Sequence, residues 1–529
     1  MSDRTEQSSA ECYDNTNDKV SSEHNYNEYD GFGDLKQRQL VDKITAHASL
    51  DEIRIMIACG AKASGSVVQG LRPLHYAVHC NNLECVRMLI ARAGSGDSER
   101  SAKSIIDAFD DVGYTALHLA AEAGNLCAVT ALLDAGASPA FSHLPDSSFP
   151  QGYRVEEPLR LALKGGHYDV AEELCKAGAD ANATYFRGSE LSLVSPSSIK
   201  AVRLLLRYGA RVNVSDREGL TPLMRACRHR AGMEAANALI DAGADINATA
   251  SERQDFRTPL HYAILAGHPQ LVAILIERGA LVKMRPGYSK PGPLDVAVLR
   301  DNNEIIDSLL SAPDADPNAV TSYVGSPLHL ACCTAASGEL TDPALTVYRL
   351  LAAGADPNLC PSFDDDEGNS NSENSSSVLK APLVEYFRSS LPGNAGVAHH
   401  HLPGAIYIYD FDLVHALIAH GARVVFCSPF DSPYGLLRVL RGVAQPENRR
   451  VWNLLLEAAE SFSLGNISRM VSPLPMRARM ELHERAMNPI GLQHTCRVTI
   501  RRCIKPFLRQ TVKELEITEC MKRYLLFEE

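Results

Sequence analysis

Residues 258–280 read TPLHYAILAGHPQLVAILIERGA, and this stretch decides the fold. Thr258 can cap a helix, Pro259 occupies the first turn, where no backbone N–H is missed, and Leu260 begins the buried face. A second helix ends in paired aliphatic residues and then in Gly279, whose backbone can take the left-handed conformation that ends a helix. The stretch therefore predicts one helix–turn–helix unit.

The same unit recurs along the chain with a spacing close to 33 residues. Related opening tetrapeptides begin at Arg72, Thr115, Thr221, Thr258 and Ser326. Closing Gly-Ala pairs begin at Gly60, Gly136, Gly178, Gly209, Gly243, Gly279, Gly354 and Gly421. One such helix pair cannot bury its apolar face alone, so neighbouring pairs are expected to stack.

This pattern resembles the ankyrin repeat family over residues 34–460. The resemblance implies an all-α solenoid of about ten helix–turn–helix repeats. Degenerate openings are expected at Pro293, Pro382 and Pro433. Each histidine of the opening tetrapeptide can bond to a loop of the neighbouring repeat, so we interpret these as structural: His75, His118, His261 and His329.

A different pattern follows the repeats. Leu492, Cys496 and Ile500 are spaced i, i+4, i+8, so on a helix their side chains form one narrow apolar stripe. Three arginines lie around the stripe and are expected to keep the other face of the helix in water: Arg497, Arg501 and Arg502. Such a stripe needs a partner, which is either the preceding repeat or another protein.

An ankyrin array followed by this helix resembles the ankyrin repeat and SOCS box family. The BC box of that family corresponds to Leu492–Ile500, and its closing Tyr-Leu-Leu to Tyr524-Leu525-Leu526. The resemblance implies a three-helix SOCS box over residues 488–529, preceded by a connecting segment over 461–487. It also implies a substrate-recognition subunit, not itself an enzyme, of an elongin–cullin–RING ubiquitin ligase.

The resemblance assigns roles to individual residues. Leu492, Cys496 and Ile500 would bind elongin C, which pairs with elongin B. The cullin, which the family resemblance suggests is cullin-5 with its RING subunit, would contact five residues: Leu515, Ile517, Tyr524, Leu525 and Leu526. Glu516 and Thr518 stand where the family has prolines, so the choice of cullin is left open. The target protein cannot be identified from the sequence.

Four insertions are expected to interrupt the array, at 93–109, 141–156, 361–379 and 387–410. Residues 1–33 carry a net charge of −6 and are expected to be a disordered acidic segment. His399, His400 and His401 suggest a metal site. Three adjacent ligands without a nearby carboxylate or thiolate pair form a poor one, however, so we expect neither a metal nor a cofactor.

Composition excludes several classes of protein. The net charge of −12 argues against a nucleic-acid-binding protein. No apolar stretch approaches the roughly twenty residues that cross a bilayer, and the acidic N-terminus lacks a signal-peptide pattern. We therefore expect a soluble protein of the cytoplasm, with the nucleus as an alternative. No phosphate loop, nucleophile elbow or H-E-x-x-H motif occurs, so no catalytic residue is predicted.

One alternative function stays open. The chain could be a plain ankyrin scaffold whose C-terminal helices only cap the array. A cap would bury the Leu492 stripe against the preceding repeat, where three residues offer an apolar partner: Trp452, Leu454 and Leu455.

Overall fold

The computed structural model describes residues 35–93, 105–140, 156–285, 288, 290–321, 325–361, 379–390, 408–428, 431–437, 439–440, 442–469, 474–488, 491–504 and 508–528. The acidic segment 1–33, most of each predicted insertion and the histidines 399–401 lie outside these residues. The chain divides into two compact units, the first ending at Asp180 and the second beginning at Ala181.

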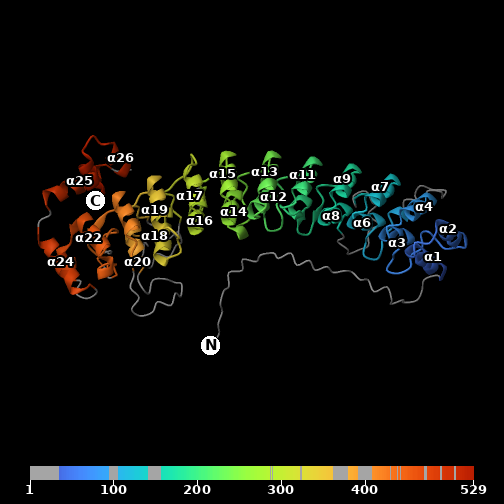
Figure 1. The fold of residues 1–529 in the computed structure, drawn as a ribbon, viewed down its shortest axis with the longest axis horizontal. Helices are drawn as coiled ribbons and strands as arrows, with labels where there is room; N and C mark the ends of the chain where they lie inside the picture. The colour runs from blue at the N-terminus through green and yellow to red at the C-terminus, as the bar shows by residue number, and fades with distance from the viewer. Residues whose placement is uncertain are drawn as a thin grey trace, which may run out of the picture. The chain divides into compact units, whose positions relative to one another are not determined.

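The first unit is built from successive helix pairs (Figure 1). Its helices are α1 Leu35–Thr45, α2 Leu50–Ala58, α3 Pro73–His79, α4 Leu83–Ala93, α6 Ala116–Glu122, α7 Leu126–Asp134, α8 Pro158–Lys164 and α9 Tyr168–Lys176. The first helices of the pairs, α3, α6 and α8, pack on one another, and so do the second helices, α4, α7 and α9.

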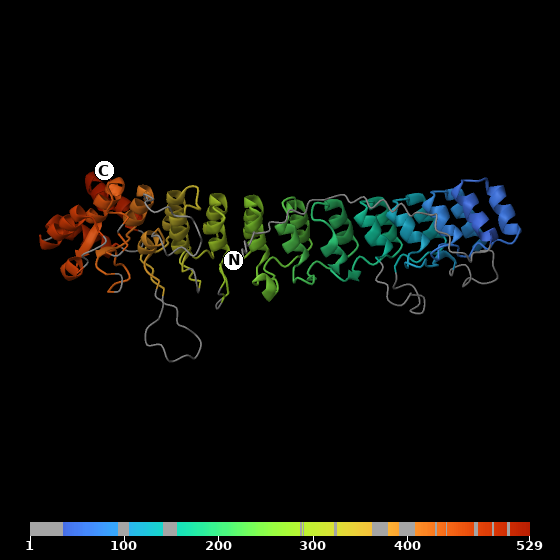
Figure 2. The same ribbon diagram turned by 90° about the horizontal axis from the view of Figure 1, so that it is seen from below.

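The second unit continues the same architecture. Its repeat helices are α10 Glu190–Leu193, α11 Ile199–Arg207, α12 Pro222–Arg228, α13 Met233–Asp241, α14 Pro259–Ala266, α15 Pro269–Glu277, α16 Pro293–Leu299, α17 Asn303–Leu310, α18 Pro327–Ser337, α19 Pro343–Ala352, α20 Pro382–Ser389, α21 Phe411–Ala419 and α22 Arg449–Ala458. Helices α12, α14, α16, α18 and α20 form one layer, and α15, α17, α19 and α21 form the other (Figure 1). In the view from below, successive repeat helices of this unit stand side by side (Figure 2).

Among the described residues, the C-terminal part of the second unit adds five helices. These are α23 Leu464–Arg469, α24 Met476–Met487, α25 Leu492–Cys503, α26 Leu508–Glu514 and α27 Glu519–Leu526. The predicted connecting segment 461–487 thus contains α23 and α24, and three helices follow it. The fold is the predicted all-α ankyrin solenoid with a C-terminal SOCS box.

Thr221 and Ser326 cap their helices as predicted, whereas the hydroxyl of Thr258 lies 2.9 Å from Nδ1 of His261 instead. The Thr221 hydroxyl accepts a hydrogen bond from the backbone N–H of Met224, and the Ser326 hydroxyl accepts one from His329. Proline stands at the first position of α12, α14 and α18. Most helix pairs then close at a glycine with positive φ, for example 93° at Gly279, a conformation that glycine adopts without strain; the pair α16–α17 has no glycine there.

Two of the repeated histidines bridge to the next repeat, which confirms the structural interpretation for them. Nε2 of His75 lies 3.3 Å from the carbonyl oxygen of Tyr114, and Nε2 of His329 lies 3.1 Å from that of Lys380. In α16, Asp295 stands at the helix position that the histidine occupies in the other repeats. Its buried carboxyl group accepts a hydrogen bond from the backbone N–H of Gly292.

An asparagine ladder, which the sequence analysis missed, also joins neighbouring repeats of the second unit. Asn213 donates to the carbonyl oxygen of Gly243 and accepts from the N–H of Asp245, one repeat further on. Asn182, Asn247, Asn318 and Asn358 each make the equivalent pair of bonds to the repeat that follows. The ladder therefore satisfies the carbonyl group of five closing glycines and the N–H group two residues after each of them.

The last repeat departs from the pattern. Pro293 and Pro382 begin helices as predicted, but Pro433 does not, because residues 431–437 form turns. Nearby, β3 (Val424–Phe426) pairs in parallel with β4 (Ala459–Phe462), on either side of α22. A second, antiparallel pair, β1 (Thr184–Tyr185) with β2 (Gly188–Ser189), forms a hairpin before α10.

Candidate functional site on the C-terminal helices

The last three helices share a small apolar core of their own. Leu508 and Val512 of α26 are buried together with Leu525 and Leu526 of α27. Ile504 and Ile517 pack partly buried against this cluster. Thr518 caps α27, accepting a hydrogen bond from the N–H of Met521. Leu525 and Leu526, which were predicted to contact a cullin, therefore pack α27 against α26 in this structure.

Two arginines of α25, Arg497 and Arg501, do not lie in water, so that part of the sequence analysis is wrong for them, whereas Arg502 is exposed as predicted. Arg497 is only 9% exposed, and its guanidinium lies 3.4 Å from the ring centroid of Tyr524 and 4.4 Å from that of Phe527. Arg501 donates to the carbonyl oxygens of Leu525 and Ile418. The planar guanidinium can stack on a ring while its edge donates hydrogen bonds, which explains why arginine serves here as a packing residue.

Burial of this arginine face has an electrostatic cost. Desolvation lowers the pKa of Arg501 to about 9, with Arg497 adding to the effect and Glu460 opposing it. Glu460 also receives a salt bridge of 2.6 Å from Arg502 and one of 2.9 Å from Arg423. Carbonyl oxygens and one carboxylate thus offset the three positive charges of α25.

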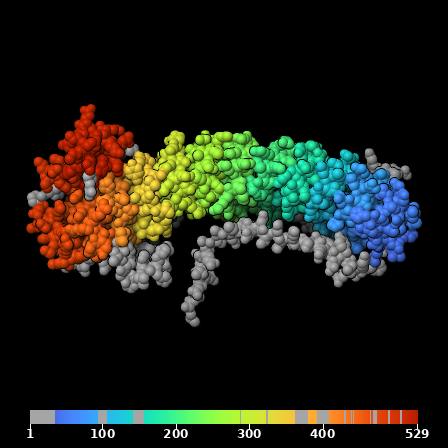
Figure 3. Space-filling model, viewed as in Figure 1, coloured from blue at the N-terminus to red at the C-terminus, as the bar shows by residue number. Residues whose placement is uncertain are grey.

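Further contacts fasten the C-terminal helices to the last repeat, on which they rest in Figure 3. Nε2 of His494 lies 2.6 Å from the carbonyl oxygen of Ala459 on β4. Nε2 of His415 on α21 lies 3.1 Å from that of Phe527. The C-terminal helices are therefore bound to both α21 and β4 by these hydrogen bonds, in addition to the arginine contacts.

The opposite face of α25 is open. Leu492 is 80% exposed and Ile500 is 40% exposed, and Cys496 between them is exposed too. Because successive helical residues are 100° apart, Cys503 falls on the same face and is also exposed. The sequence analysis did not assign Cys503 to the stripe, although its i+7 spacing from Cys496 is the signal that could have found it.

The capping hypothesis predicted a buried stripe against Trp452, Leu454 and Leu455. The structure instead buries Trp452 beneath α24, where its indole N–H donates to Glu481 over 2.8 Å. The residues of the stripe are exposed, and it is the arginine side of α25 that contacts the last repeat. One side of α25 thus packs on the repeat, and its apolar side faces outward.

The other residues assigned to a cullin lie around α27. Leu515, Ile517 and Tyr524 are half-buried, whereas Glu516 and Thr518, which replace the prolines of the family, are exposed. In the part of the chain that the structure describes, no cluster of three or more metal-binding side chains is present. Within the same residues, no helix has the length and apolarity to span a membrane.

Comparison with known proteins agrees with this architecture. Ankyrin-repeat family models match residues 44–143, 93–185, 193–250 and 230–276, and the SOCS box model matches residues 488–526.

Curated relatives match parts of the chain. Human ankyrin repeat and SOCS box protein 16 is 32% identical over 34% of this chain and 41% of its own length. Ankyrin repeat and SOCS box protein 3 of Bos taurus is 30% identical over 30% of this chain and 28% of its own length. The E3 ubiquitin-protein ligase KEG of Arabidopsis thaliana is 27% identical over 59% of this chain and 17% of its own length. The chain thus spans less than half of each of these relatives. With ankyrin repeats followed by a SOCS box in one chain, the protein belongs to the ankyrin repeat and SOCS box family.

Proposed function

We propose that this chain is the substrate-recognition subunit of an elongin–cullin–RING ubiquitin ligase. In this proposal the repeats of residues 34–460 bind a target protein, and the SOCS box of residues 488–529 binds elongin C, which brings elongin B. The observation that carries the proposal is the open stripe of α25, with Leu492 80% exposed on a helix whose other face is fastened to the array.

The stripe has the properties of a helix that docks into an apolar groove. Leu492, Cys496 and Ile500 span about 12 Å along one face, since each residue rises 1.5 Å. A few such anchors supply most of the free energy of helix-in-groove binding. Because the arginine contacts already order α25, little conformational entropy is lost on binding. Truncating Leu492 would then cost about 2–4 kcal/mol of binding free energy.

The proposal makes the chain an adaptor without chemistry of its own. It would bring lysines of a bound target close to a charged ubiquitin-conjugating enzyme, which is catalysis by proximity. For the cullin, we propose the half-buried edge formed by Leu515, Ile517 and Tyr524. Cullin-5 is the family's partner, and the absence of prolines at Glu516 and Thr518 makes the choice of cullin the first detail to measure.

Capture of purified elongin B–elongin C by the full chain tests the proposal. The variant carries Leu492→Pro and Cys496→Phe. Proline is tolerated at the first position of a helix, where Leu492 stands, so this change removes the side chain and keeps α25. Phenylalanine at the exposed Cys496 blocks the groove contact without entering the core. The matched control is Met521→Ala, at a 57% exposed position on α27.

We expect the wild type and the Met521→Ala control to capture elongins, and the double variant to capture at least thirtyfold less. Amide exchange of α25 should show that the double variant is folded. If the wild type captures no elongin, or the folded double variant captures as much, the ligase proposal is wrong and the scaffold alternative takes its place.

A further inference from the structure

Four successive loops of the second unit form a row, which we call the tip row. They precede α10, α12, α14 and α16, and they comprise residues 184–189, 215–219, 251–257 and the described part of 284–290. In Figure 2 the loops of these repeats extend on one side of the green helices. Because neighbouring helices pack about 10 Å apart, the four tips together span about 30 Å.

Two of the contacts between successive tips are aromatic–arginine pairs. The guanidinium of Arg217 lies 3.7 Å from the ring centroid of Phe186, one tip earlier. In the same way, the guanidinium of Arg285 lies 4.9 Å from the ring centroid of Phe256. A stacked guanidinium keeps N–H groups at its edge that can bind a carboxylate. Each pair therefore offers a directed donor beside an apolar ring, and Phe186 is still 57% exposed.

Further bonds hold the tips in this arrangement. The Ser251 hydroxyl donates to the carbonyl oxygen of Glu218, one tip earlier, over 2.8 Å. The Tyr288 hydroxyl donates to the carbonyl oxygen of Asp255 over 3.0 Å, and Lys290 forms a salt bridge of 3.5 Å with the Asp255 carboxylate. The tip row is therefore ordered before a partner binds, which reduces the entropy lost on binding.

The tip row carries an excess of positive charge in a chain whose net charge is −12. Two of its carboxylates already have cationic partners: Arg225 lies 3.0 Å from Asp216, and Arg257 lies 3.1 Å from Asp255. Four exposed arginines form no ion pair with the residues that the structure describes, and each tip supplies one of them: Arg187, Arg217, Arg253 and Arg285. Against these four stand the carboxylates of Glu218 and Glu252. The tip row therefore favours a negatively charged occupant.

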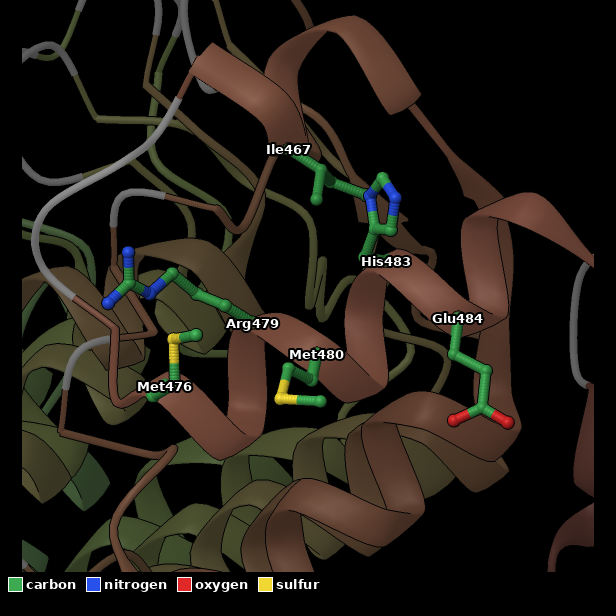
Figure 4. A pocket seen from close by; sticks show the side chains of 6 residues that line it. All are labelled: Ile467, Met476, Arg479, Met480, His483 and Glu484. Atoms are coloured by element: carbon green, nitrogen blue, oxygen red, sulfur yellow. The ribbon is translucent and has the colours of Figure 1, made fainter.

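The groove beside α24 shows no comparable excess. Its volume is about 480 Å³, and one arginine and one glutamate are among the residues that line it: Ile467, Met476, Arg479, Met480, His483 and Glu484 (Figure 4). Its charges are therefore balanced and select no particular occupant.

We infer that the tip row binds an extended acidic segment of the target protein, which deepens the proposed role of the repeats and rests on it. The two aromatic–arginine pairs lie two repeats apart, about 20 Å, which an extended chain spans in about six residues. Acidic residues about six positions apart would therefore place one carboxylate on Arg217 and one on Arg285. Apolar residues beside these acids would contact Phe186 and Phe256.

A nucleic acid strand matches the tip row less well. It carries a negative charge on every nucleotide, and Glu218 and Glu252 stand directly beside Arg217 and Arg253 in the row. The net charge of −12 also repels a long polyanion. An extended peptide can place neutral residues opposite the two glutamates and acidic residues opposite the arginines.

A displayed library of random peptides, each long enough to span both pairs, tests this inference on the full chain. Peptides are first depleted on an Arg217→Glu/Arg285→Glu variant and then selected on the wild type. Both positions are exposed, so the substitutions leave the buried core of the repeats untouched. The matched control is Arg203→Glu, the same charge reversal at an exposed arginine of α11, outside the tip row. Urea unfolding of each variant shows that it is folded.

We expect the enriched peptides to carry Asp or Glu about six positions apart, with an aromatic or aliphatic residue beside at least one of them. Their affinity should fall at least tenfold on Arg217→Glu and on Arg285→Glu, and stay within threefold on Arg203→Glu. Arg217→Gln, which removes the charge without reversing it, should weaken the same peptides. A peptide of the same composition with its acids gathered at one end should bind the wild type at least fivefold more weakly.

The inference is overturned if the enriched peptides are neutral or basic, or if none is enriched over the depleted pool. Equal binding of the peptide with gathered acids would overturn it too, because the row would then attract net charge alone. So would a single-stranded thymidine oligonucleotide that binds more tightly than every selected peptide and is lost on Arg217→Glu.

The outcome is separable from that of the elongin proposal. Arg217→Glu should still capture elongin B–elongin C, and the Leu492→Pro/Cys496→Phe variant should still bind the selected peptides. Peptide binding without elongin capture by the wild type would leave the tip row as a binding surface of an ankyrin scaffold.

Discussion

Leu526→Ala should loosen the SOCS box although Leu526 lies outside the apolar stripe. The side chain is 1% exposed and belongs to a core of only four buried residues, so its loss removes a large part of what holds α26 to α27. Removing a buried leucine costs about 3 kcal/mol, from lost burial and from the cavity left behind. Since every 1.4 kcal/mol is a factor of ten, local opening should become about a hundredfold more frequent.

Amide hydrogen exchange with peptide-level resolution measures this opening. Peptides covering Leu508–Glu514 and Glu519–Leu526 should exchange about a hundredfold faster in the variant, and peptides covering α14 and α15 should not change. Met521→Ala on the same helix is the control and should alter the exchange less than threefold, since its side chain is exposed. If Leu526→Ala also changes exchange less than threefold, Leu526 is not part of a stabilising core, and its predicted role as a cullin contact regains support.

Three further outcomes follow from buried charged and titratable groups. Arg501→Ala removes the donor to two carbonyl oxygens, so α25 should lose about 1.5–3 kcal/mol of protection in amide exchange, which Arg501→Lys restores only in part. Burial raises the pKa of Asp295 to about 6, so its contribution to stability is complete below pH 4 and is lost as the pH rises through 6. In urea unfolding, the free energy of unfolding of Asp295→Asn should be higher than that of the wild type by on the order of 3 kcal/mol at pH 7, and equal to it near pH 4. Burial lowers the pKa of His261 and His329 to about 4, so their contribution to stability is present above pH 6.5 and is lost as the pH falls through 4. Variants with glutamine at these positions should therefore show a smaller drop in Tm between pH 7 and 5 than the wild type. An equal drop would contradict this.

The repeats could be predicted because their signals are local. Thr221 and Ser326 cap the helices that follow them within three residues, and Gly279 ends a helix through its own backbone conformation. The turns around Pro433 could not be predicted in this way, because β3 and β4 pair across α22 and residues distant in sequence decide the conformation there.

The side of α25 that packs on the last repeat could not be predicted from the sequence. The exposed stripe could be predicted from its spacing, but Arg497 and Arg501 count as charged residues and so indicated a solvated face. Their acceptors and rings come from other helices, and the carbonyl group of Ile418 lies 83 residues before Arg501. Only the folded chain brings these groups together, so hydropathy along one helix cannot report them.

The arginine face also limits how the SOCS box can be moved between proteins. Residues 491–528 bring guanidinium groups that need the Ile418 carbonyl oxygen and Glu460 of this particular repeat as acceptors. If the segment follows an array without those acceptors, either its arginines are buried without hydrogen-bond acceptors or the SOCS box does not pack on the last repeat. A chimera would therefore have to carry α21, β3, α22 and β4 along with the three terminal helices, so the transplantable piece begins near Phe411 rather than at the edge of the SOCS box.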